Sequence, residues 1–279
     1  MAFKVENKNF FSVSMSVYSG DSSSSVKEAI ASIIEQSLPP SEIILVVDGP
    51  VSNEIISVIA TYENTYSIMK VIWLDKNVGH GKARRIGLEN CKYELVALMD
   101  SDDIARSDRF QKQVAVIEAN TDVSVVGGQI EEFDNDTGLK VGVRQVPYLD
   151  CDIKKYLKKR CPMNQMTVMF RKSHVMQAGG YLDWHYNEDY YLWIRMAIQG
   201  YVFHNMEDTL VDVRVNDDMY GRRGGLKYFL SEARLQRFML EAKLISILGF
   251  LSNVSIRFVV QVLLPNKIRK ILFLRFFRD

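Results

Sequence analysis

The sequence predicts an α/β protein in which a mostly parallel, Rossmann-like sheet is flanked by helices. Three observations support this fold class. Short apolar runs alternate with amphipathic stretches along residues 11–100, as in βαβ units. The runs are nearly continuous in apolar residues, which is typical of strands buried on both faces. Several of them end in polar or turn-forming residues, as at Asp48-Gly49-Pro50 and at Asp100.

The first half of the chain contains four apolar runs with helical patterns between them. Residues 11–18 form the first predicted strand, and apolar residues at helical spacing predict a helix that ends before Pro39-Pro40. The pattern then predicts a strand at 42–47, a helix at 53–62, a strand at 69–74, a loop and helix at 77–90, and a strand at 95–99. Because helices connect these strands, we expect their following loops to meet at one edge of the sheet.

The second half of the chain has a less regular pattern. Apolar periodicity predicts a helix at 109–119, a strand at 123–133, a short strand at 166–170, and a helix at 190–199 that Gly200 ends. Residues 135–152 are rich in loop-forming residues, and no helix or strand is predicted there.

The composition excludes several classes of protein. Lys and Arg number 35 and Asp and Glu number 34, so the net charge of +1 does not favour nucleic-acid binding. The cysteines, Cys91, Cys151 and Cys161, are odd in number and widely spaced, which argues against a disulfide framework or a structural zinc site. Residues 1–9 lack the apolar core of a secretory signal. A cytoplasmic location is therefore expected.

An acidic cluster follows the predicted strand at 95–99. It contains Asp100, Asp102 and Asp103, and three interpretations compete. The first is a turn that caps the next helix. The second, an EF-hand loop, is excluded because Ala105 and Gln111 stand where glycine and glutamate are needed. The third is an Asp-x-Asp site, in which carboxylates and substrate phosphate oxygens share a Mg²⁺ or Mn²⁺ ion.

Two further segments carry candidate ligand-binding residues. Asp48 ends the second predicted strand, where it serves either a ligand or the turn with Gly49. The segment 77–87 combines two glycines at a helix start with basic residues that include Arg84. This combination favours an anionic ligand, but a solvated basic helix start is the alternative.

Two more candidates lie later in the chain. Glu188-Asp189 opens a helix, either as plain N-capping residues or as a general base whose neighbour raises its pKa. We expect a flexible basic loop that contains Arg214 and the segment 220–225. This loop either closes over phosphates or is simply exposed.

Taken in order, these motifs resemble the family 2 glycosyltransferases, which have the GT-A fold. The resemblance covers most of the chain, from Phe11 to about Arg223. It rests on residues 13–18, 29–40, 42–49, 77–87, 100–103 with Arg109 and Gln113, and 188–189. Residues 163–173 and 178–181 further resemble bacterial enzymes that build O-antigen and exopolysaccharide repeat units.

The resemblance implies a role for each candidate residue. The residues implied to bind the nucleotide-sugar are Ser16, Tyr18, Asp48, Asn77, Arg84 and Asp100, with Arg222 and Arg223 closing over the diphosphate. Asp102 and Asp100 are implied as ligands of Mn²⁺ or Mg²⁺. Asp189, with Glu188 beside it, is implied as the base that deprotonates the acceptor hydroxyl. Attack from the opposite face inverts the anomeric centre, so an α-linked donor gives a β-glycoside.

The chain is expected to divide into a GT-A domain at 1–225 and a helical segment at 226–279. Between Glu241 and Asp279 there is no acidic residue, while seven Lys and Arg residues interrupt apolar sequence. A spanning helix is not expected, because Asn253 and Arg257 break the longest apolar stretch. We expect a basic amphipathic segment on the inner face of the cell membrane; packing on the domain or in a dimer interface is the alternative.

The predicted function is transfer of a hexose from a UDP-sugar to a saccharide linked to undecaprenyl diphosphate, in the biosynthesis of a bacterial surface polysaccharide. Transfer of an N-acetylhexosamine is the alternative within this class. A sugar-phosphate nucleotidyltransferase would share the sheet and the metal, but its Gly-rich loop and Lys after the first strand are absent from this sequence. A non-catalytic carbohydrate-binding relative is a further alternative, against which the presence of Asp100, Asp102 and Asp189 argues.

Overall fold

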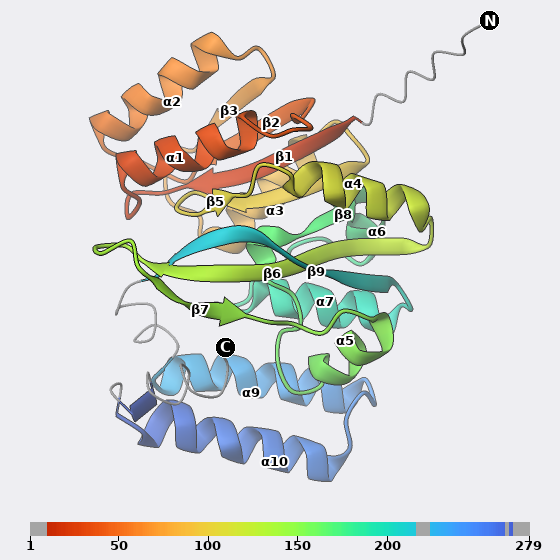
Figure 1. Cartoon of the computed structure of the whole chain (residues 1–279). Helices are drawn as coiled ribbons and strands as arrows, with labels where there is room; N and C mark the ends of the chain where they lie inside the picture. Colours follow the sequence, from red (N-terminus) through yellow and green to blue (C-terminus); the bar gives the residue numbers. More distant parts are fainter. Residues whose placement is uncertain (1–9, 216–223, 266–267, 270–279) are drawn as a thin grey trace, which may run out of the picture.

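The structure, a computed structural model, describes residues 10–215, 224–265, 268 and 269 (Figure 1). Its first half is a parallel sheet with the strand order β3-β2-β1-β4. The strands are β1 (Phe11–Val17), β2 (Glu42–Val47), β3 (Met69–Trp73) and β4 (Leu95–Asp100). The connecting helices are α1 (Ser23–Ile34), α2 (Asn53–Thr65) and α3 (His80–Asn90). The elements predicted for this half are confirmed to within a few residues.

The second half of the sheet is mixed in direction. Strand β8 (Met169–Arg171) runs antiparallel between β4 and β6 (Val123–Asp134). Strand β9 (Val202–Val215) pairs in parallel with β6, and β5 (Ile104–Ala105) pairs antiparallel with β9. Strand β7 (Lys140–Arg144) pairs antiparallel with β6. The parallel arrangement expected for the sheet therefore holds for β1 to β4 and for the β6–β9 pair.

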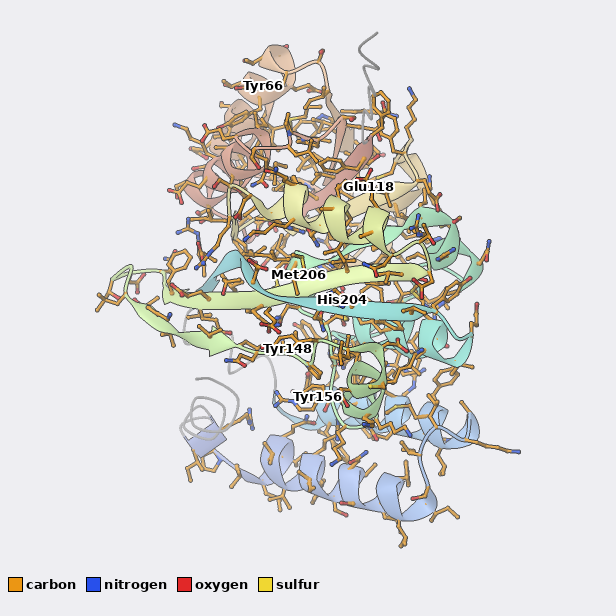
Figure 2. All side chains as sticks on the ribbon, turned by 45° about the vertical axis from the view of Figure 1, so that its right-hand side comes forward. Tyr66, Glu118, Tyr148, Tyr156, His204 and Met206 are labelled. Carbon is orange, nitrogen blue, oxygen red and sulfur yellow. The ribbon has the colours of Figure 1, made fainter. Side chains whose placement is uncertain are left out.

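Several elements of this half differ from the sequence prediction. The segment 135–152, expected to be loop, contains β7 and the start of α5 (Asp150–Leu157). The strand expected at 166–170 begins as the 3-10 helix η1 (Gln165–Thr167) and becomes extended only at β8. The long strand β9 was not predicted. Residue Tyr148 lies beside β9, where its carbonyl accepts a 3.0 Å hydrogen bond from the Asn205 N–H (Figure 2).

The sheet has one hydrophobic core on each face. In β2, the alternate residues Ile43, Leu45 and Val47 contribute to the core that α1 and α2 cover. Ile44 and Val46 point to the other core, which includes residues of α3 and α7. This alternation follows from the two-residue period of a strand. Both faces are buried, which explains why the strand is continuous in apolar residues. The remaining helices of this region are α4 (Arg109–Ala119), α6 (Lys172–Gln177) and α7 (Glu188–Ile198).

Two C-terminal helices form a further layer at the bottom of Figure 1, with α10 outermost. Helix α9 (Leu226–Glu241) is followed by α10 (Ile247–Phe258) and the π-helical turn η2 (Val259–Leu263). Leu235 and Met239 of α9 belong to the same core as Trp193 of α7. None of the helices in the described part of the chain has the length and apolar character needed to cross a bilayer. The domain boundary at residue 225 stays a prediction.

Candidate active site

The order of the strands points to the ends of β1 and β4 as the edge where a ligand would bind. The chain moves outward from β1 to β2 and β3, and then returns to the other side of β1 with β4. In α/β sheets, ligands bind outside the carboxyl ends of strands at such a reversal. Ser16 and Asp100 are register partners at this edge. Ser16 is partly buried, whereas the Tyr18 side chain just beyond it is 42% exposed. Ser16 and Tyr18, both predicted to contact the nucleotide, therefore lie at this edge.

The loop before α3 is fastened to the end of β2. The buried Asp48 carboxylate accepts hydrogen bonds from the Val78 N–H at 2.7 Å and the Gly79 N–H at 3.1 Å. The Asn77 side-chain amide donates to the Asp48 carbonyl at 3.2 Å. Gly49 has φ +87°, and a Cβ there would lie 2.5 Å from the Asn77 nitrogen. Asp48 and Asn77, both predicted to bind the donor, are thus brought together, and Asp48 orients the loop.

Arg84 of α3 forms a buried ion pair with the end of β4. Its Nη2 atom donates to Oδ1 of Asp100 at 2.5 Å, and the Arg84 side chain is only 6% exposed. Burial lowers the pKa of Arg84, but the charges of Asp100 and other nearby acidic groups outweigh it and raise the pKa, so the side chain stays a cation. Its buried Nη1 atom has no hydrogen-bond partner among the described residues. An unpaired buried donor is costly, so an anionic ligand at this point would be stabilised.

The acidic turn after β4 does not cap a helix. Helix α4 begins at Arg109 with Asp108 at the N-cap, and β5 intervenes. Asp103 is instead buried, and its Oδ1 accepts the Arg214 backbone N–H at 3.1 Å. Burial, followed by the charges of Asp102 and Asp100, raises the pKa of Asp103 well above its ordinary value. The helix-cap interpretation of the cluster is therefore wrong, and Asp103 joins the turn to β9.

The residues predicted as metal ligands lie on the same turn. Asp102 is exposed, and Asp100 shares one carboxylate oxygen with Arg84. No three His, Cys, Asp or Glu side chains in the described part of the chain form a ready-made metal site. Two carboxylates nevertheless suit a hard divalent cation that takes its remaining oxygens from phosphate and water. The donor set thus fits a cation shared with a ligand better than a cation held by protein alone.

Helix α7 begins at the pair predicted to act as the catalytic base. Its N-cap is Asn187, so neither Glu188 nor Asp189 is the N-cap residue. Glu188 is buried against the first turn of α3, because a Cβ on Gly81 would lie 3.3 Å from the Glu188 side chain. The His80 Nε2 atom lies 3.7 Å from the Glu188 carboxylate. The nearby Arg84 charge, followed by burial, lowers the pKa of His80, so this imidazole is neutral at pH 7.

Both acids at the start of α7 have raised pKa values. Burial, followed by the charge of Asp189, raises the pKa of Glu188 to about 7. Burial also raises the pKa of Asp189, whose Oδ1 accepts the Tyr190 N–H at 2.6 Å. The Cys161 thiol lies 3.8 Å from the other carboxylate oxygen. Since the Arg84 charge acts on Asp100, Glu188 and Asp189, the structure brings these four predicted residues together.

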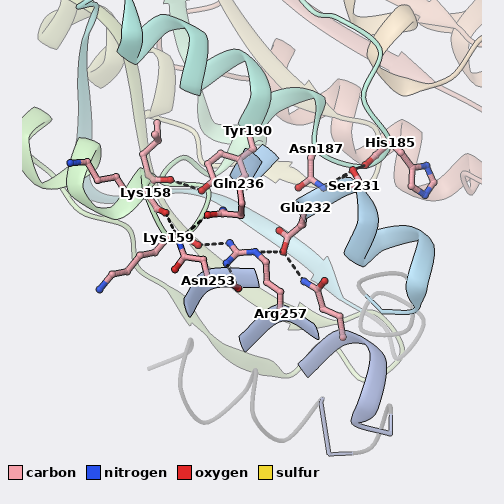
Figure 3. Close-up of polar contacts among 12 residues, drawn as sticks. Lys158, Lys159, His185, Asn187, Tyr190, Ser231, Glu232, Gln236, Asn253 and Arg257 are labelled. Atoms are coloured by element: carbon pink, nitrogen blue, oxygen red, sulfur yellow. Dashed lines mark hydrogen bonds and ion pairs between the residues drawn. The ribbon is translucent and has the colours of Figure 1, made fainter. Parts of the chain in front are cut away.

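The segment that leads into α7 is held by α9. The Ser231 hydroxyl donates to the His185 carbonyl at 2.6 Å and accepts from the Asn187 amide at 3.3 Å (Figure 3). The Trp184 indole N–H donates to the Ser231 carbonyl at 3.3 Å. These bonds connect the C-terminal helices to the residues immediately before Glu188.

Two of the predicted site residues cannot be placed. Arg222 and Arg223 lie outside the described residues. Arg214, which was expected in the same flexible loop, belongs to β9 and forms an ion pair with Glu28. Sequence reasoning missed His80 and Cys161 as neighbours of the acidic pair. No local motif marks either residue, because their positions follow from tertiary packing.

Comparisons with known proteins agree with this geometry. A model of "Glycosyl transferase family 2" matches residues 12–175, and "Glycosyl transferase family group 2" matches residues 95–268. The chain is 38% identical to an Escherichia coli UDP-Gal:alpha-D-GlcNAc-diphosphoundecaprenol beta-1,3-galactosyltransferase, over 93% of each chain. It is 35% identical to the amylovoran biosynthesis glycosyltransferase AmsE of Erwinia amylovora, over 94% of this chain and 97% of AmsE.

Solved structures show the same fold. S. aureus TarS 1-349 in complex with UDP-GlcNAc is similar with a TM-score of 0.65 and 17% identity, over 95% of this chain and 75% of that one. The mannosyltransferase PcManGT from Pyrobaculum calidifontis, in complex with GDP-Man and Mn²⁺, has a TM-score of 0.61 and 15% identity, over 89% and 74%. The predicted GT-A fold is thereby confirmed.

Proposed function

The chain belongs to glycosyl transferase family 2, and we propose that it is an inverting enzyme that transfers a hexose from a UDP-sugar to a lipid-linked saccharide. The observation that carries this proposal is the convergence of Arg84, Asp100 and the Glu188-Asp189 pair at the carboxyl ends of β1 and β4. A cation, a metal-binding carboxylate and a candidate base are the groups that glycosyl transfer from a diphosphate donor requires.

The donor is proposed to lie along the edge formed by β1, β2 and the start of α3. Arg84 would use its unpaired Nη1 atom to bind the diphosphate, while its Nη2 atom stays on Asp100. Asp102 and Asp100 would hold Mn²⁺ or Mg²⁺. When bound there, the metal would offset the negative charge that develops on the leaving diphosphate. Asp48 would keep the loop with Asn77 in place beside the nucleoside.

Asp189 is proposed to remove the proton from the acceptor hydroxyl. Its carboxylate is held from two sides by the Tyr190 N–H and the Cys161 thiol, so its orientation is fixed before the acceptor arrives. A raised pKa makes Asp189 a stronger base than an exposed aspartate, provided that it is ionised. The new bond then forms on the face of the sugar opposite the diphosphate, and the product is a β-glycoside.

The names of two relatives support a proposal for the acceptor and for the class of product. The E. coli relative is named for a diphosphoundecaprenol acceptor and a UDP-Gal donor, and the Erwinia relative for amylovoran biosynthesis. We therefore assign this chain to the assembly of a bacterial surface polysaccharide of the O-antigen type, at the cytoplasmic face of the membrane. Because the structurally similar S. aureus protein binds UDP-GlcNAc, N-acetylhexosamine transfer is the second candidate function. Family membership excludes the nucleotidyltransferase interpretation.

A donor screen tests the proposal directly. UDP-Glc, UDP-Gal, UDP-GlcNAc and UDP-GalNAc would each be incubated with Mn²⁺ and a short-chain GlcNAc-diphospho-lipid, and both UDP and glycosylated lipid would be measured. We expect one UDP-hexose to give a β-linked product, and chelation of the metal to abolish transfer. Asp102→Ala and Asp189→Asn should each lower kcat/KM by about 100-fold or more. Asp122→Ala, at an exposed acid in the turn just before β6, is the control. Undiminished metal-dependent transfer by Asp102→Ala would remove the metal assignment.

A further inference from the structure

Helix α10 has its polarity reversed relative to an ordinary surface helix. A surface helix normally turns apolar residues toward the core and polar residues toward water. None of the residues of α10 is buried; Ser252 and Ser255 are exposed, and four of its large apolar residues are more than half exposed. They are Ile247 (67% exposed), Leu248 (79%), Leu251 (53%) and Ile256 (59%). Leu263 in the following turn is 60% exposed. We call these five side chains the outer apolar face.

The polar side of the same helix faces the protein. Arg257, whose side chain is 11% exposed, forms a 2.8 Å ion pair with Glu232 of α9. Its guanidinium also donates to the Lys159 carbonyl and, at 3.3 Å, to the Asn253 carbonyl (Figure 3). An arginine that is only slightly exposed and has this many partners is difficult to displace, because each broken bond would leave a charged donor unpaired.

Neighbouring polar residues complete the attachment. The Asn253 amide donates to the Lys158 carbonyl at 2.9 Å and to Oε1 of Gln236 at 2.8 Å. The Gln261 amide donates to Glu232 at 2.7 Å. Asn253, Arg257 and Gln261 recur at helical spacing of four residues, so they define one stripe. This stripe prevents rotation of α10 about its axis, and the outer apolar face is therefore held outward.

The charge around this face indicates which partner would cover it. The side chains of Lys158 and Lys159 are exposed next to the stripe, and Lys243 is exposed just before α10. The sequence from residue 242 to residue 278 contains basic residues and no acidic ones. In a symmetric dimer through this face, the same basic residues would approach one another and repel. An anionic lipid surface, in contrast, complements both the charge and the apolar side chains.

We propose that the outer apolar face of α10, together with the exposed basic residues Lys158, Lys159 and Lys243 near the same helix, is the surface by which the protein docks on anionic phospholipid bilayers. The inference rests on the proposed function only for the identity of the acceptor, which a bilayer would present. It assigns a specific face to the membrane contact and implies that α10 binds as a prefolded element. The polar stripe and the bonds from Ser231 to the segment before α7 then connect the docked helix to the catalytic region.

Vesicle flotation tests the surface with the full-length protein. The probes are vesicles of phosphatidylcholine alone and vesicles that also contain phosphatidylglycerol. We expect the protein to float with the anionic vesicles only, and high salt to weaken the binding. Leu248→Glu should lower the partition coefficient by about tenfold, because one leucine is withdrawn from the lipid. Lys158→Gln with Lys159→Gln should lower it by about tenfold for anionic vesicles.

A matched variant controls for charge. Leu139→Glu makes the same change at a 69% exposed leucine beside β7 and should float like the wild type. Absence of flotation, or equal loss with Leu139→Glu and Leu248→Glu, would overturn the proposal. So would a concentration-dependent dimer that Leu248→Glu disrupts in the absence of lipid.

Glycosyl transfer to a water-soluble acceptor, measured in parallel, distinguishes failure of the docking surface from failure of the proposed function. Flotation without transfer would refute the enzyme assignment alone, and transfer without flotation would refute the docking surface alone.

Discussion

Replacing Arg84 by methionine removes the positive charge that forms a buried ion pair with Asp100. The two side chains are 6% and 23% exposed and lie 2.5 Å apart, and Glu188 and Asp189 also interact with the Arg84 charge. Removing one partner of a buried pair costs about 3–5 kcal/mol, because the other charge stays buried without compensation. Since water reaches part of Asp100, we expect the lower end of this range. Urea unfolding without donor, followed by tryptophan fluorescence and circular dichroism, measures the change in the free energy of unfolding.

The adjacent residue provides the control for this measurement. Arg85 pairs with Glu89 at 2.8 Å on the surface, where the side chains are 51% and 42% exposed. Arg85→Met should therefore change the free energy of unfolding by no more than about 0.5 kcal/mol. The cost of Arg84→Met should also shrink by about 1–3 kcal/mol in an Asp100→Asn background, since the two residues are in contact. Equal costs for Arg84→Met and Arg85→Met, or equal costs in both backgrounds, would refute the reasoning.

Three further predictions follow from the packing and charge of the site. Glu188 has a raised pKa of about 7, so its contribution to stability is complete at low pH and is lost as the pH rises through this value. The unfolding free energy of Glu188→Gln relative to that of the wild type should therefore be about 2–3 kcal/mol higher at about pH 8 than at about pH 5. An equal difference between the two proteins in urea unfolding at both pH values would contradict this. Gly87→Ala should cost about 1–3 kcal/mol of unfolding free energy, because its Cβ would lie 2.4 Å from the Ser14 hydroxyl oxygen. Ser14→Ala in the same chain should recover most of this loss, and no recovery would show that the contact is not the cause. Ser231→Ala removes the hydrogen bond to the His185 carbonyl, which positions the segment before Glu188, and should lower kcat by about 3- to 10-fold with the donor KM unchanged. A change in KM alone, measured by steady-state kinetics, would disprove this positioning role.

The sequence predicted β1 to β4 well because their signals are local. Each is a short apolar run that ends at a polar turn, and the helices between them have clear periodicity and recognisable ends. Strand β9 was missed although it is long. Glu207 and Asp208 interrupt its apolar pattern, and its partner β6 lies about eighty residues earlier in the chain. Pairing between such distant segments leaves little trace in a local pattern.

The candidate site could be predicted from the sequence in part. The position of Asp100 at the end of a buried strand and of Arg84 at a preceding helix start followed from the βαβ pattern, whereas the direct contact between them is seen only in the structure. The nearness of Asp189 followed only from the resemblance to a family, since about ninety residues separate it from Asp100. The role of Asp103 was not predictable, because its partner is a backbone N–H of the unpredicted strand β9.

The balance of charge in the site supports the proposal that a donor with two phosphates binds there together with a cation. Asp100, Asp102, Glu188 and Asp189 are acidic, and Arg84 is the buried cation whose charge acts on three of them. A nucleoside diphosphate would add further negative charge to a region where burial already raises the pKa of Glu188 and Asp189. A divalent cation on the exposed side of the Asp100–Asp102 turn would reverse this repulsion without competing for the Arg84 contact. Arg84 and the metal would then both offset the negative charge of the diphosphate, and Asp189 would accept the proton of the acceptor hydroxyl.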